Sequence, residues 1–127
     1  MHPVVQVFVA LAGLLHVVIF AMESLLFSRP KVWRRFLIES AADAEVARVW
    51  AYNQGFYNLF LALGALGGLV AVWSGWQVAG AAIALFACGC MALAGAVLIG
   101  TDRRMLRAGI MQAAPPLLAL LLALLLS

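Results

Sequence analysis

Polar residues that could do chemistry in this chain lie inside long apolar runs. Glu23 and His16 interrupt the first run and are seven residues apart, a spacing that places them on one face of a regular helix. Carboxyl and imidazole groups commonly transfer protons in enzymes, and both are costly to bury in hydrocarbon. In a site that binds or converts a ligand, we predict Glu23 as a proton donor and His16 as its proton partner. The alternatives are that Glu23 extends to the membrane interface and that His16 is a hydrogen-bonded core residue.

A second polar group occupies one short window: Asn53-Gln54-Gly55-Phe56-Tyr57-Asn58. Its four polar side chains form two i,i+4 pairs, which predicts one stripe on a helix. At 1.5 Å per residue, this window, Glu23 and His16, together with Gln112 in the last apolar run, lie about 5 to 16 Å from the same membrane face. This shared depth predicts one polar cluster. The alternative is that these groups only bond across helices and lock the bundle. The predicted ligand-binding residues are Asn53, Gln54, Tyr57, Asn58 and Gln112.

The elements that position these residues are predicted to be membrane-spanning helices. The chain has 127 residues, of which 67% are hydrophobic and 10% charged, whereas a soluble domain is about half apolar and a quarter charged. We predict an all-α polytopic membrane protein, a single four-helix bundle covering residues 1–127. Runs of about 20 apolar residues can cross the hydrocarbon core, and four are expected at about 4–27, 49–73, 77–100 and 105–126.

Basic residues fall in two loops, one between the first and second spans and one between the third and fourth. The positive-inside rule places both loops in the cytoplasm and both termini outside, and it explains the net charge of +3 without a nucleic-acid partner. Seven of the eight basic residues are arginine, which together with heavy alanine use is typical of a GC-rich bacterial genome. The expected location is therefore the bacterial cytoplasmic (inner) membrane.

The first basic loop also contains a short helical pattern. Val32, Trp33, Phe36 and Leu37 recur at helical spacing beside basic residues, which predicts a short amphipathic helix on the membrane surface. Ser40 then has the position of an N-cap for the helix of the second span.

Small residues recur every fourth position along the third span: Gly80, Ala84, Cys88, Ala92, Ala96 and Gly100. This spacing predicts close helix packing and offers a face for a homodimer. Cys88 and Cys90 would point about 200° apart on a helix, with no further ligands in view, so packing is predicted for both and no metal site. Pro115 and Pro116 favour a kink in the fourth span, which makes a cavity beside the polar stripe plausible.

The polar residues together resemble a known family. His16 with Glu23, the window from Asn53 to Asn58, and Gln112 ahead of Pro115 are similar to small bacterial membrane proteins catalogued as domain of unknown function 1304. The resemblance covers nearly the whole chain. It implies a four-helix membrane protein and no particular reaction.

Three functions fit these residues, and whether the protein is an enzyme stays open. The first is binding or conversion of a small lipophilic molecule in the cytoplasmic leaflet, with Glu23 and His16 as proton-transfer groups and no cofactor. The second is a non-catalytic subunit that assembles or stabilises a membrane complex. The third is a small transporter or proton pathway that acts as a dimer. Haem held by two histidines would need two facing copies of His16.

Overall fold

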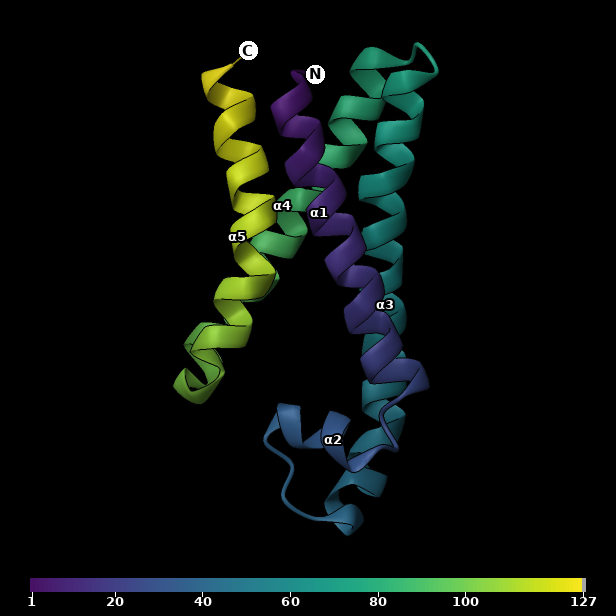
Figure 1. Cartoon of the computed structure of the whole chain (residues 1–127), viewed down its shortest axis with the longest axis vertical. Coiled ribbons are helices and arrows are strands. Elements are labelled where there is room, and N and C mark those ends of the chain that lie inside the picture. The colour runs from purple at the N-terminus through teal and green to yellow at the C-terminus, as the bar shows by residue number, and fades with distance from the viewer. Residues whose placement is uncertain (127) are drawn as a thin grey trace.

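The computed structural model describes residues 1–126, and the elements it assigns over those residues are all helical (Figure 1). The order is α1 (Pro3–Phe20), the π-helical turn η1 (Ala21–Leu25), α2 (Pro30–Trp33), the 3-10 turn η2 (Arg34–Phe36), α3 (Ala41–Trp73), α4 (Gln77–Thr101), the 3-10 turn η3 (Arg103–Met105) and α5 (Leu106–Leu125).

Over residues 1–126, four helical stretches are long and apolar enough to cross a membrane: Pro3–Leu25, Ala41–Trp73, Gln77–Thr101 and Arg103–Leu125. The predicted all-α bundle with four spans is confirmed. The 33 residues of α3 extend about 50 Å, well beyond a hydrocarbon core of about 30 Å. Its first turns therefore project past the core, and Ser40 caps them as predicted, its hydroxyl accepting a hydrogen bond from the Asp43 N–H at 3.1 Å.

Both termini and the α3–α4 turn lie at one end of the bundle, which we call the terminal end (Figure 1). The opposite end, the basic end, carries α2 and the connection from α4 to α5 (Figure 1). Its basic residues are Arg29, Lys31, Arg34, Arg35, Arg48, Arg103, Arg104 and Arg107. One basic end and one terminal end are what the predicted topology requires. Which end faces the cytoplasm stays a prediction from the positive-inside rule.

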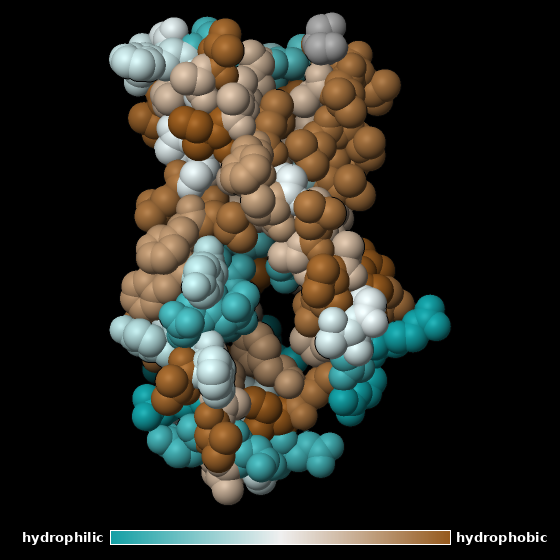
Figure 2. Space-filling view, turned by 180° about the vertical axis from the view of Figure 1, so that it is seen from behind, coloured by the Kyte–Doolittle hydropathy of each residue, from teal (hydrophilic) through white to brown (hydrophobic). Residues whose placement is uncertain are grey.

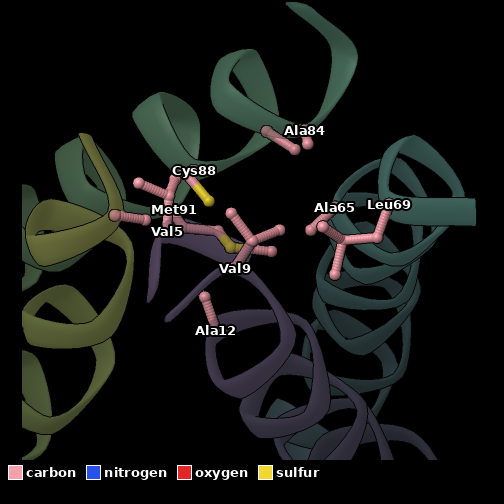
Figure 3. Packing of buried hydrophobic residues seen from close by; sticks show 10 residues of the cluster. Val5, Val9, Ala12, Ala65, Leu69, Ala84, Cys88 and Met91 are labelled. Carbon is pink, nitrogen blue, oxygen red and sulfur yellow. The ribbon is translucent and has the colours of Figure 1, made fainter. Parts of the chain in front are cut away.

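Small side chains join the helices toward the terminal end. A Cβ atom added to Gly80 would lie 2.6 Å from the Gly68 carbonyl oxygen, so α3 and α4 touch through their backbones. A core of small and medium-sized residues surrounds this contact, and the side chains of Cys88 and Met91 point into it (Figure 3). Its members are Val5, Val9, Ala12, Ala65, Leu69, Ala84, Ala87, Cys88, Met91 and Ala119.

Only part of the predicted row of small residues on α4 packs against other helices of the chain. Gly80, Ala84 and Cys88 are buried within the chain, which confirms close packing there, whereas Ala96 and Gly100 are exposed. A homodimer through this face stays a prediction, and the half that could meet a second copy is the one nearer the basic end.

Toward the basic end the bundle divides into two pairs, α1 with α3 and α4 with α5, and α5 continues through Pro115 and Pro116 (Figure 1). Gly95 keeps the second pair together, since an added Cβ atom would lie 2.7 Å from the Ala113 Cβ atom. Large side chains such as Leu61 and Met111 face the space between the pairs. This difference in side-chain size keeps the two pairs apart.

The segment between α1 and α3 folds back across the basic end of the bundle (Figure 1). A short helix, α2, lies where one was predicted, but its Trp33 side chain is only 5% exposed and packs with Phe27 and Ala44. The predicted short helix is therefore present, with one of its apolar side chains packed inside the protein. Helical structure ends at Leu37, whose φ of 63° turns the chain back toward α3. The placement of this helix on a membrane surface stays a prediction.

Candidate ligand-binding site

A cavity of about 840 Å³ lies between the two helix pairs, toward the basic end. Seen from behind, the molecule is hollowed there, and hydrophilic side chains lie beside the opening (Figure 2). Most of the lining is apolar, and it comes from α1, α3, α4 and α5 as well as from the turns. The polar residues that line the cavity are Glu23, Arg35, Gln54, Tyr57, Asn58, Thr101 and Gln112.

Glu23 enters this cavity from the π-helical turn at the end of α1. The turn is closed by a hydrogen bond from the Leu26 N–H to the Ala21 carbonyl at 2.9 Å. A π turn inserts one extra residue per turn and is frequent at functional sites. The insertion rotates Glu23 relative to the rest of α1, so that this half-buried carboxylate faces α3.

Asn58 holds the Glu23 carboxylate in place. The Asn58 Nδ2 group donates to Glu23 Oε2 at 2.8 Å and also to the Gln54 carbonyl of its own helix at 3.2 Å. Asn58 is only 6% exposed. The second bond anchors the amide to α3, so the amide is preorganised toward the carboxylate. Among residues 1–126, Oε1 of Glu23 has no hydrogen-bond partner and is available to a ligand.

Gly55 makes this contact between α1 and α3 possible. A Cβ atom at Gly55 would collide with the Ser24 hydroxyl. That hydroxyl donates to the Tyr52 carbonyl at 2.8 Å and joins the two helices beside Glu23. Sequence reasoning missed Ser24. The available signal was that Ser24 is adjacent to Glu23 and lies at the same depth as Tyr52.

His16 is completely buried in α1. Its Nδ1 atom lies 2.8 Å from the Ala12 carbonyl oxygen, and because a carbonyl only accepts, Nδ1 carries the hydrogen. Its Nε2 atom is buried and has no partner among the described residues. Within residues 1–126 no hydrogen bond links His16 to Glu23, and His16 is not part of the cavity lining. Its role as a proton partner stays a prediction.

The structure brings most of the predicted ligand-binding residues together. Gln54, Tyr57, Asn58 and Gln112 line the cavity with Glu23, whereas Asn53 is exposed and lies outside the lining. Helix geometry explains the difference, because Asn53 lies about 140° around the helix from Asn58. The four polar residues of this window therefore span a wider arc than one stripe.

Arg35 and Thr101 also line the cavity and were missed by sequence reasoning. Arg35 belongs to η2, and it reaches the cavity because the segment around α2 folds under the bundle. Thr101 is the last residue of α4, and its hydroxyl donates to the Val97 carbonyl at 2.8 Å. The position of Thr101 at the end of a span was a usable signal, whereas Arg35 had none.

Over the described part of the chain, no group of three or more His, Cys, Asp or Glu side chains could hold a metal ion. Cys88 is buried and Cys90 is half-buried, and both are free thiols. Cys88 belongs to the apolar core, in agreement with the packing role predicted for it.

The fold and the cavity define a class: multi-pass helical membrane proteins with a mostly apolar cavity between their helices. A family model described as "Protein of unknown function (DUF1304)" matches residues 10–124, and the chain belongs to this family. The resemblance predicted from the polar residues is confirmed, and the match includes every predicted site residue from His16 to Gln112. Comparison with curated proteins and with solved structures found no match.

Proposed function

We propose that this protein binds a small lipophilic molecule in the cavity between its helix pairs, within the cytoplasmic leaflet of a bacterial inner membrane. The observation that carries the proposal is a cavity of about 840 Å³ with a mostly apolar lining and one carboxylate fixed by an asparagine. Ligand pockets typically measure about 300 to 1,000 Å³ and combine an apolar wall with a few placed polar groups. This cavity has both properties.

The position of the cavity supports a ligand that arrives from the bilayer. The helix pairs separate within helices that are long and apolar enough to span a membrane, which supports an opening toward the bilayer (Figure 1). Inside, Glu23 Oε1 and the amides of Gln54 and Gln112 offer hydrogen bonds that lipid tails cannot provide. A molecule with an apolar body and one polar end would contact the apolar lining with its body and hydrogen-bond to these polar groups with its end.

Binding is a better-supported function than conversion. Proton transfer on a ligand needs a donor and an acceptor within hydrogen-bond reach of it. Glu23 lines the cavity and His16 does not, so the pair predicted to transfer protons does not meet at one place. Glu23 acts in this proposal as a recognition group.

The test is native mass spectrometry of the gently purified full chain, followed by identification of any bound molecule. Ala94 lines the cavity, whereas the neighbouring Leu93 lies outside the lining. Ala94→Phe should therefore expel the ligand, and the matched control Leu93→Phe should retain it. Glu23→Gln, which keeps the shape and the bond from Asn58 but removes the charge, should weaken binding.

Wild-type protein that carries only bulk lipid, in the same amount as Ala94→Phe, would contradict the proposal. The polar groups would then serve to lock the bundle, and a search for a protein partner would follow.

A further inference from the structure

We infer that the ligand is a zwitterionic amphiphile, with a primary ammonium group bound by Glu23 and a phosphate or carboxylate group bound by Arg35. The inference rests on the proposed function and adds the chemical class of the ligand. It is carried by the two opposite charges that line one cavity, each without an ionic partner.

The two charged side chains reach the cavity from different elements. Glu23 comes from the π-helical turn after α1, and Arg35 comes from η2, beneath the bundle. Among residues 1–126 the ion pairs are Arg48 with Glu45 and Arg104 with Asp102. Neither Glu23 nor Arg35 is therefore paired with a protein charge, although they share one cavity.

Electrostatic complementarity selects the ligand class. A purely anionic amphiphile would be repelled by Glu23, and a purely cationic one would be repelled by Arg35. A neutral molecule would leave the half-buried Glu23 carboxylate without a counter-charge, which is costly. A zwitterion of zero net charge satisfies both side chains and enters a cavity whose lining also has zero formal charge.

The geometry at Glu23 further selects a group that donates hydrogen bonds. Asn58 occupies Oε2, and Oε1 has no partner among the described residues. A primary ammonium has three N–H donors and can bond to Oε1, whereas a quaternary ammonium has none. Arg35 presents a planar guanidinium, the group that binds phosphate and carboxylate with two parallel hydrogen bonds. Phosphatidylethanolamine-type lipids and soluble glycerophosphoethanolamine both carry this pair of groups with zero net charge.

The test offers the purified full chain equal amounts of phosphatidylethanolamine, phosphatidylcholine and phosphatidylglycerol with identical acyl chains, and native mass spectrometry measures the bound ratio. Wild-type protein should retain phosphatidylethanolamine at least about tenfold over the other two, the size of one lost charge-assisted hydrogen bond. Glu23→Gln should abolish this preference. Arg35→Gln should lower phosphatidylethanolamine binding by a similar factor, and because Arg35 is exposed and unpaired, this variant should fold normally.

Arg103→Gln is the matched control, since Arg103 is also a basic-end arginine but does not line the cavity; it should bind as the wild type does. Displacement of the lipid by millimolar glycerophosphoethanolamine would identify a soluble zwitterion as the ligand, and retention of the lipid would identify a phospholipid. Equal retention of the three lipids by the wild type, or unchanged binding by Arg35→Gln, would overturn the inference. If the wild type instead holds another lipophilic molecule that Ala94→Phe expels, the proposed function stands and only the zwitterion is wrong.

Discussion

The bond between Asn58 and Glu23 should be measurable as a coupling free energy. In the variants, Glu23→Met removes the acceptor and Asn58→Leu removes the donor, each with little change in volume. Hydrogen bonds to charged groups contribute about 1.5 to 3 kcal/mol in proteins, whereas polar contacts between membrane helices average about 0.6 kcal/mol. The bond is short, at 2.8 Å, and its donor is 6% exposed. We therefore expect a coupling of about 1 to 2 kcal/mol.

The assay is a double-mutant cycle, with the free energy of unfolding measured by SDS titration in mixed micelles and followed by circular dichroism. Each single variant should be destabilised, because it leaves a partly buried polar group without its partner. The double variant should be less destabilised than the sum of the two, because two apolar side chains then meet. A coupling below about 0.3 kcal/mol, within the usual additivity error, would show that the two side chains act independently and would refute the role given to Asn58.

Three further substitutions test the fold around the cavity, each by the same unfolding measurement. Gly80→Val should destabilise the bundle by roughly 3 kcal/mol, since an added Cβ atom would lie 2.6 Å from backbone atoms of α3. Gly67→Ala should be nearly neutral, because nothing lies within 4 Å of a Cβ atom added there. Equal losses of stability in the two variants would contradict the close approach of α3 and α4. Ser40→Ala should cost about 1 kcal/mol through loss of the α3 cap, and an unchanged value would argue against that cap. Gly55→Ala should destabilise the wild type more than it destabilises Ser24→Ala, because the added methyl group collides with the Ser24 hydroxyl; equal losses in the two backgrounds would contradict the contact.

Much of the architecture was predictable, because it depends on properties that follow directly from residue type. The apolar runs define the spans, and depth counted along a straight helix is enough to bring Glu23, Asn58 and Gln112 to one level. Counting works here because an antiparallel bundle converts position in sequence into height in the membrane.

The parts that could not be predicted depend on departures from a regular helix. A spacing of seven places His16 and Glu23 on one face only while the helix is regular, and the π turn at Ala21–Leu25 breaks that relation. Arg35 reaches the cavity because Leu37 ends the helix and Trp33 packs on Phe27. Both departures are decided by tertiary packing, which a periodic pattern does not record.

The location of the cavity follows from where the chain places small and large residues. Gly68 and Gly80 bring α3 and α4 into backbone contact toward the terminal end, whereas the bulky Leu61 and Met111 face the gap near the basic end. Helices held together at one end and separated by bulky side chains at the other enclose a wedge. Because Glu23 lies at the wide end of that wedge, its carboxylate is neither sealed in the core nor released to water. The ligand proposed above would therefore reach this carboxylate without the bundle having to unfold.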